Sequence, residues 1–195
     1  MPRLPLILAS SSPRRRQLLQ QAGYTFTVAP PHESAEDEPR PGETPRELVA
    51  RLARQKASDV ARGIERGLVI GCDTVAESGG QILGKPADRG DARRMLAALR
   101  GQEHRVYSGL CLWRRPDDRM WQEVEITTLV MERLTDAELE NYLATGDWQG
   151  KAGAFGYQDG LDWVRVVSGS ESNVVGLPLE LLERMIANVD REQVS

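Results

Sequence analysis

The chain has 195 residues, of which 40% are hydrophobic and 28% charged, and its formal net charge is −4. This length supports one substantial core, and the negative net charge argues against a broad nucleic-acid-binding surface. Cys72 and Cys111 make no disulfide framework, and two histidines, His32 and His104, are a poor basis for a zinc site or a histidine triad. No apolar stretch approaches the roughly 20 residues of a membrane span, so we expect a soluble, cytoplasmic protein that binds neither membranes nor nucleic acid.

The first third of the chain alternates between short apolar runs and helical patterns. Residues 6–8 predict a buried strand, and Ser12 followed by Pro13 is typical of the start of a helix. Residues 24–28 alternate in polarity like a second strand. A loop rich in proline and acidic residues follows. Residues 44–47 then form a capping box with proline at the first helical position, which predicts the start of a long helix.

The remaining two thirds predict further strands and helices. In chain order these are a strand at 68–71, a hairpin at 75–83 with Gly79 and Gly80 at its tip, a helix at 88–99, strands at 104–113 and 121–131, a helix opened by a capping box at 135–138, a strand at 162–167 and a last helix that starts at 177–178. Strands alternate with helices, yet adjacent strands also form hairpins. We therefore predict a single α/β domain over residues 1–195, with a mixed, twisted sheet flanked by helices.

Two arginines occupy the first turn of the first predicted helix. A helix N-terminus carries about half a positive charge, so Arg14 and Arg15 are each unfavourable there by roughly 0.3–1 kcal/mol. Such local conflicts concentrate at functional sites, and a phosphate would bind both the helix end and the guanidinium groups. Ser10 and the two serines after it would add donors on the same strand-to-helix turn. Solvated arginines on a surface helix are the alternative interpretation.

A second polar group surrounds the predicted hairpin. Asp73 lies at the end of a buried strand, where a carboxylate could hold a divalent cation, activate a water molecule or simply cap a turn. With a two-residue turn at the glycines, Thr74 would pair with Lys85 and Asp73 with Pro86. Asp73 and Lys85 would then point to opposite faces of the sheet. Their convergence on one site requires a bulge or an early end to the pairing.

Three other segments supply polar candidates. Lys56 follows an apolar helical face, where it is either a functional cation or a lysine that extends its charge to solvent. Gln158 lies in the glycine-rich segment 151–160, which is alternatively a mobile loop. Residues 169–178 are either part of the site or only the approach to the last helix.

Six segments of the chain together resemble the Maf family. They are ASSSPRRRQLL, LARQKA, GCDTV, LGKPAD, KAGAFGYQ and SNVVGLP, in this order between residue 6 and about residue 185. The resemblance implies a Maf/ITPase-like fold, an elongated α/β domain with two lobes and a cleft between them. It also implies a nucleoside triphosphate pyrophosphatase that cleaves between the α- and β-phosphates, commonly as a homodimer, with Mg²⁺ or Mn²⁺ as cofactor and a role in the cytoplasm.

The resemblance also implies roles for particular residues. Asp73 matches the carboxylate that accepts the proton of the attacking water. The expected substrate-binding residues are Ser10, Arg14, Arg15, Lys56, Thr74, Lys85 and Gln158. Among these, Arg15, Thr74 and Gln158 match the branch of the family that acts on dTTP and UTP. Asp73 with Glu33 or Glu36 would hold the metal.

Two alternatives stay open from the sequence. One is the branch of the family that acts on 7-methyl-GTP, and the other is a nucleotide-binding regulator of cell division without turnover. Modified pyrimidine nucleotides are further candidate substrates. The chain departs from the family's pattern at Cys72, at Asp159 where glycine is usual, and at Glu171, where an aromatic residue usually lies nearby.

Overall fold

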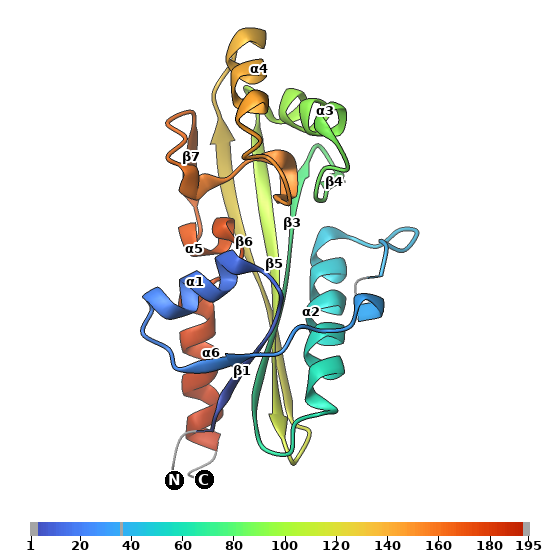
Figure 1. Ribbon diagram of the computed structural model, residues 1–195, viewed down its shortest axis with the longest axis vertical. Coiled ribbons are helices and arrows are strands. Elements are labelled where there is room, and N and C mark those ends of the chain that lie inside the picture. Colours follow the sequence, from blue (N-terminus) through green and yellow to red (C-terminus); the bar gives the residue numbers. More distant parts are fainter. Residues whose placement is uncertain (1–3, 36, 193–195) are drawn as a thin grey trace.

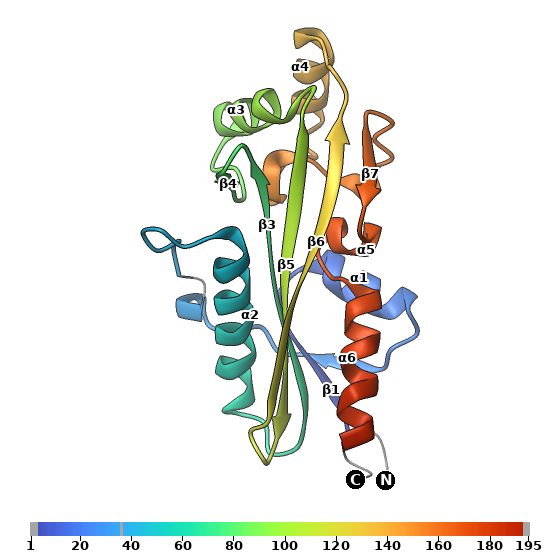
Figure 2. The same ribbon diagram turned by 180° about the vertical axis from the view of Figure 1, so that it is seen from behind.

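The molecule is elongated, with long strands along its axis and helices on both sides. A computed structural model describes residues 4–35 and 37–192, and Figures 1 and 2 show it from opposite sides. The strands are β1 (Leu6–Ala9), β2 (Phe26–Val28), β3 (Gly67–Ser78), β4 (Gln81–Leu83), β5 (Glu103–Arg115), β6 (Met120–Met131) and β7 (Val164–Ser168). The helices are α1 (Pro13–Gln21), α2 (Pro45–Ala61), α3 (Arg89–Leu99), α4 (Asp136–Thr145), α5 (Glu171–Val175) and α6 (Leu179–Glu192), with short 3-10 turns η1 (Glu33–Ala35), η2 (Ala152–Ala154) and η3 (Tyr157–Asp159).

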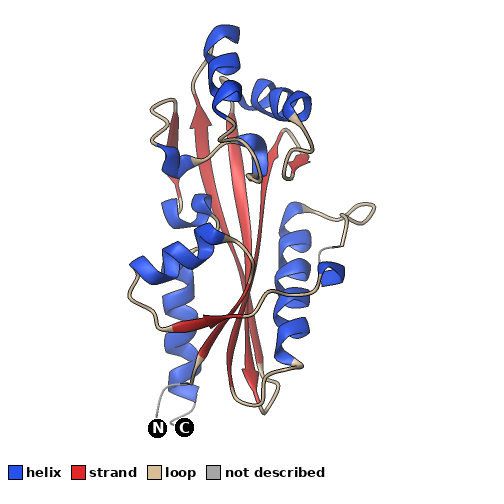
Figure 3. Cartoon of the chain, in the orientation of Figure 1, coloured by secondary structure: helices blue, strands red, loops and turns tan. Residues whose placement is uncertain are grey.

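All seven strands of the described chain form one mixed sheet, and Figure 3 shows how helices flank it. The strand order is β2-β1-β3-β5-β6-β7, and β4 pairs with the far end of β3. β1 is parallel to β2 and β3, whereas the pairs β3–β5, β5–β6 and β6–β7 are antiparallel. The predicted fold class is therefore confirmed. None of the helices in residues 4–35 and 37–192 is long and apolar enough to cross a membrane.

The helix starts follow the predicted capping signals. Ser12 caps α1 ahead of Pro13, and α2 and α4 each begin with the complete capping box that the sequence indicates. Two segments differ from the prediction. β3 runs without a break through both the predicted strand and the first arm of the hairpin. The five-residue helix α5, capped by Ser170, lies where we expected either part of the site or an approach to the last helix.

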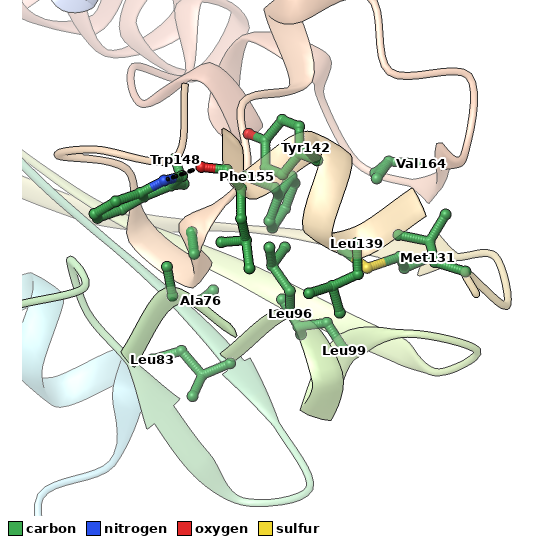
Figure 4. Packing of buried hydrophobic residues seen from close by; sticks show 14 of the residues in the cluster. Ala76, Leu83, Leu96, Leu99, Met131, Leu139, Tyr142, Trp148, Phe155 and Val164 are labelled. Atoms are coloured by element: carbon green, nitrogen blue, oxygen red, sulfur yellow. Dashed lines mark hydrogen bonds between the residues drawn. The ribbon is translucent and has the colours of Figure 1, made fainter. Parts of the chain in front are cut away.

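The sheet carries two separate cores at its two ends. One end buries residues of α3, α4, β7 and η2 against the end of β3, the start of β5 and the end of β6, and Figure 4 shows part of this packing. At the other end, α1 and α6 pack on one face of the sheet and α2 on the opposite face. β3 belongs to both cores, because Ile70 and Cys72 lie in the second one and Ala76 in the first. Val75 packs with Leu48 and Leu52 of α2, which leaves Asp73 and Thr74 between the clusters.

Two glycines allow α2 to lie directly on the sheet. A Cβ atom built on Gly71 of β3 would lie 2.2 Å from the carbonyl oxygen of Ala53, and one on Gly109 of β5 would lie 2.1 Å from that of Val49. Real Cβ atoms do not approach a backbone oxygen so closely, so only glycine fits at either position. The close approach sets the height of α2 above β3, and with it the reach of side chains from α2 to the strand.

The edge of β3 is open between its two partners. β1 pairs with β3 only as far as Gly71, and the pairing with β4 begins at Ala76 and ends at the turn. In the described chain, residues 72–75 therefore have a strand partner on the β5 side alone. The predicted pairing of Thr74 with Lys85 does not form, because β4 ends at Leu83. This is the early end of pairing that convergence of Asp73 and Lys85 requires.

His104 is a buried polar residue in the first core. Its side chain is 2% exposed, and its ring meets that of Phe155 edge to face with centroids 5.3 Å apart. Neither ring nitrogen has a hydrogen-bond partner among the described residues. Burial lowers the pKa of His104 from 6.5 to about 4, because the charged imidazolium would lose its hydration there.

We expect His104 to make the fold sensitive to mild acid. Because its pKa is lower in the folded than in the unfolded chain, the neutral imidazole stabilises the fold fully above about pH 6.5, and this contribution is lost as the pH falls toward 4. At about pH 5 the loss amounts to roughly 2 kcal/mol. Urea unfolding at about pH 7.5 and pH 5 should show a smaller decrease in the free energy of unfolding for His104→Leu than for the wild type. Equal decreases in the two proteins would contradict the expectation.

Candidate active site

One cavity of about 390 Å³ lies at the open edge of β3. Its walls come from the turn after β1, the start of α1, β3, α2, the segment after β4, the segment around η2 and the end of α5. The eight predicted substrate-binding and catalytic residues all line it. They are Ser10, Arg14, Arg15, Lys56, Asp73, Thr74, Lys85 and Gln158. Residues up to 148 positions apart in sequence thus share one site (158 − 10 = 148), although their roles there stay predictions.

The side chains of the adjacent residues Asp73 and Thr74 point to opposite faces of the sheet at this edge. Successive side chains of a strand point to opposite faces of a sheet. Asp73 points toward α2, where its Oδ1 accepts a hydrogen bond from Lys56 Nζ at 2.7 Å. Both residues are almost fully buried, with 4% exposure for Lys56 and 9% for Asp73. Thr74 points the other way, toward α1 and α5, where it contacts Arg15 and Gly176.

Arg15 connects three segments of the site through its guanidinium group. Nε donates to the carbonyl oxygen of Gly176 at 2.8 Å, and Nη1 donates to the carbonyl oxygen of Cys72 at 2.7 Å. Nη1 also donates to Ser10 Oγ, and Nη2 to Thr74 Oγ1. Four of the five guanidinium N–H groups therefore have partners in the protein itself. The sequence suggests a phosphate contact for Arg15, whereas the structure shows an arginine already committed to fixing its neighbours.

Arg14 makes fewer hydrogen bonds within the described chain than Arg15 does. Its Nη2 donates to the carbonyl oxygen of Gly150 at 2.9 Å, which links the start of α1 to the segment before η2 across the cavity. Burial and, secondly, the nearby positive charge of Arg15 lower the pKa of Arg14, while Asp159 acts in the opposite direction. A partly buried cation beside another cation gains from a bound anion, because the anion offsets both costs. Arg14 is accordingly the better candidate for a phosphate contact.

The charge of the cavity is strongly positive. Among the described residues, its lining includes five cations and a single carboxylate, that of Asp73. The cations are Arg14, Arg15, Lys56, Lys85 and Lys151. A small, enclosed cluster of one sign focuses the field on the site whatever the net charge of the molecule. The arrangement favours an anionic ligand that carries several charges.

The glycine-rich segment shapes the side of the cavity facing α1. Gly153 and Ala154 both have positive φ, 69° and 63°, which is uncommon for alanine and typical of functional turns. The backbone N–H of Gly153 donates to the carbonyl oxygen of Gly84, directly before Lys85. Lys151 forms an ion pair with Asp159, next to Gln158. These contacts fix Lys85 and Gln158 relative to one another.

The predicted metal ligands do not all meet. Glu33 is exposed in η1 and is not among the residues that line the cavity, and Glu36 lies outside the described residues. In the described part of the chain, no three His, Cys, Asp or Glu side chains are grouped so that they could hold a metal ion. The donor set in the cavity is one carboxylate with hydroxyl groups. This set fits Mg²⁺ or Mn²⁺, which substrate phosphates help to hold, and does not fit a protein-only cage of nitrogen and sulfur ligands.

Several lining residues were not singled out from the sequence. Lys151 adds a cation, and Phe155, Val106 and Val174 add apolar surface. Ser108 lies behind the wall, fully buried and 2.7 Å from Thr74 Oγ1. The apolar residues look like ordinary core in the sequence, and only the strand register, which pairs Ser108 with Thr74, could have indicated the serine.

The chain is similar to several known proteins. The family model described as Maf-like protein matches residues 5–189. A protein of Rhodopirellula baltica named dTTP/UTP pyrophosphatase is 52% identical over 95% of this chain and 82% of its own length. One of the same name from Cereibacter sphaeroides is 46% identical over 94% of both chains. A solved HAM1 protein from Coxiella burnetii aligns over 96% of this chain and 99% of its own, but a TM-score of 0.49 at 15% identity supports no conclusion about fold or function.

Proposed function

Because this chain belongs to the Maf family, we propose that it is a nucleoside triphosphate pyrophosphatase that hydrolyses dTTP and UTP to the nucleoside monophosphate and pyrophosphate. The names of its relatives support the substrate, since proteins 42–52% identical to it are named dTTP/UTP pyrophosphatase. The observation that carries the proposal is the cavity, where one carboxylate lies among five cations.

The reaction consumes one water molecule. The water oxygen bonds to phosphorus while the bond from that phosphorus to the oxygen bridging the α- and β-phosphates breaks, and pyrophosphate leaves. In this proposal Asp73 accepts the proton of the attacking water, and Lys56 holds the carboxylate in place through the 2.7 Å hydrogen bond. Arg14 and Lys85 would bind the triphosphate, which carries about four negative charges, and Lys151, now paired with Asp159, adds a third cation to the same wall. Positioning and charge neutralisation supply most of the catalysis in such reactions.

The base of the substrate would lie against the wall that contains Gln158, Phe155 and Val174. Gln158 has the amide donor and acceptor needed to read the edge of a pyrimidine, and Phe155 and Val174 offer apolar surface to its ring. Arg15 and Thr74 belong to this wall as well. Their hydrogen bonds to Gly176 fix the end of α5 beside the proposed base site.

We expect turnover to depend on a divalent cation. Asp73 and the phosphate oxygens of the substrate would hold Mg²⁺ or Mn²⁺, and the ion would neutralise charge on the phosphates. Removal of metal with EDTA should abolish pyrophosphate release, and addition of Mg²⁺ should restore it. Isothermal titration of the metal-free protein with Mg²⁺ alone should show only weak binding, because the cavity itself offers a single carboxylate. Full activity in EDTA would contradict the metal requirement.

The substrate assignment is tested by a panel of nucleotides. Pyrophosphate release should be measured for dTTP, UTP, CTP, GTP and 7-methyl-GTP with Mg²⁺ or Mn²⁺. We expect turnover of dTTP and UTP to exceed that of the other three. Turnover centred on 7-methyl-GTP would keep the reaction and overturn the assignment of the base. Binding of every triphosphate without any turnover would instead favour a regulator.

The expected homodimer and the cytoplasmic location stay predictions that follow from the family resemblance. Light scattering coupled to size-exclusion chromatography would measure the mass of the particle in solution. A mass near 21.7 kDa, that of one chain, would contradict the dimer.

A further inference from the structure

The hydroxyl group of Thr74 has three partners before any ligand binds. It accepts a hydrogen bond from Arg15 Nη2 at 3.2 Å, lies 3.3 Å from the carbonyl oxygen of Gly176 and lies 2.7 Å from Ser108 Oγ. A hydroxyl group offers one donor and two acceptor lone pairs. The guanidinium group can only donate and the carbonyl oxygen can only accept, so when all three contacts are hydrogen bonds, Thr74 donates to Gly176 and Ser108 donates to Thr74. All three positions of the hydroxyl are then filled.

Ser108 is built into this arrangement by the sheet. It lies on β5 directly opposite Thr74 in the antiparallel ladder, so both side chains are on the same face. Its side chain is fully buried, and it lies behind the cavity wall. A serine in this place cannot reach a ligand. Its hydroxyl acts on the cavity only through Thr74.

We propose that Ser108 is a positioning residue for base preference, which it sets by saturating the Thr74 hydroxyl together with Arg15 and Gly176. Thr74 then contributes to base preference without a hydrogen bond to the base, because a direct contact would break one of its three existing bonds. The base is read instead by Gln158 and by the wall at the end of α5, which the network fixes. This inference rests on the proposed pyrophosphatase function.

The test compares nucleotide selectivity in variants of this network. The readout is the ratio of kcat/KM for dTTP to that for CTP, because a purely structural role would lower the melting temperature and leave the ratio unchanged. We expect Ser108→Ala to lower the ratio about tenfold, the effect of roughly one hydrogen bond, mainly through KM for dTTP. Ser108→Thr and Thr74→Ser, which both keep the hydroxyl, should retain the wild-type ratio.

A double variant and a stability control sharpen the result. If Ser108 acts only through Thr74, Ser108→Ala combined with Thr74→Val should have the same ratio as Thr74→Val alone. Thr145 does not line the cavity, and Thr145→Ala, which removes the hydroxyl bonds to Tyr142 and Asp147, should lower stability without changing the ratio. If Ser108→Ala does not fold, Ser108→Cys keeps the volume with a weak donor and gives the same comparison.

The outcomes separate this inference from the proposed function. A wild-type ratio in Ser108→Ala, even with a lower melting temperature, would overturn the inference and leave the pyrophosphatase function intact. Absence of turnover of any triphosphate by the wild-type protein would overturn both. A lowered ratio in Ser108→Ala together with a wild-type ratio in Ser108→Thr would support the role of Ser108.

Discussion

Replacement of Asp73 by asparagine should lower kcat by about 10²- to 10⁴-fold, the usual contribution of a positioned general base. The amide keeps the shape of the side chain and an acceptor for Lys56, but it cannot take a proton from water. Nucleotide binding should persist, because the cations that bind phosphate are unchanged. Pyrophosphate release measures the loss of turnover, and a rise of the melting temperature on addition of dTTP with Mg²⁺ measures the binding.

The matched control is Asp162→Asn. Asp162 is an exposed residue of the segment before β7 and is not among the cavity residues, so its replacement should change neither kcat nor KM. Asp73→Asn also replaces the charged acceptor of the buried Lys56 ammonium with a neutral one, which should cost about 1–3 kcal/mol of stability. Activity should therefore be compared at about 25 °C, where both proteins remain folded. Turnover within about threefold of the wild type would exclude Asp73 as the base.

The largest effect on stability is expected from Gly109→Ala. The added methyl group would lie 2.1 Å from the carbonyl oxygen of Val49 and 2.8 Å from the amide nitrogen of Ala50, and neither backbone atom can move unless α2 moves as a whole. We expect a cost of about 3 kcal/mol, at the upper end for added volume in a packed core. A chain of this size should then melt roughly 6–12 °C lower. Because α2 carries Lys56, activity should also fall.

Gly63→Ala serves as the control for this substitution. Gly63 has a negative φ, and its Cβ atom would have an ordinary contact of 3.7 Å with the carbonyl oxygen of Val60. Its replacement should change the melting temperature by no more than about 2 °C in either direction. Calorimetry would measure the melting temperatures of both variants and of the wild type. Equal melting temperatures for Gly109→Ala and the wild type would show that α2 can move away from the sheet at little cost.

Local signals in the sequence predicted much of the fold. The capping residues Ser12, Thr44 and Thr135 begin the helices that they predict, because a side-chain oxygen there satisfies N–H groups that the helix leaves free. The helix α5 was not predicted, since five residues have little helical stability of their own. It depends on contacts from distant segments, such as those of the buried Asn173 with Val106 and Thr127.

The sequence predicted which residues belong to the site better than it predicted their contacts there. Arg14, Arg15 and Asp73 were recognisable because they break local rules or match a family pattern, and the structure does bring them to one cavity. What each side chain does there could not be read from the sequence. The four bonds of Arg15 connect segments up to 161 residues apart, and such partners have no local signal. Ser108 is similar, because a single buried serine in a strand has no distinctive pattern.

The open edge of β3 makes the site sensitive to the exact length of the strand. Asp73 and Thr74 reach opposite sides of the sheet only because each occupies its own phase of a two-residue repeat. Inserting one codon between Gly71 and Asp73 would exchange the two phases, presenting the carboxylate to Arg15 and the hydroxyl to Lys56. An insertion of two codons would restore the phase but shift both groups by roughly 7 Å along the strand. A substitution in this stretch therefore alters individual contacts. A change of length by a single residue would instead change the partners of the carboxylate and of the hydroxyl at the same time.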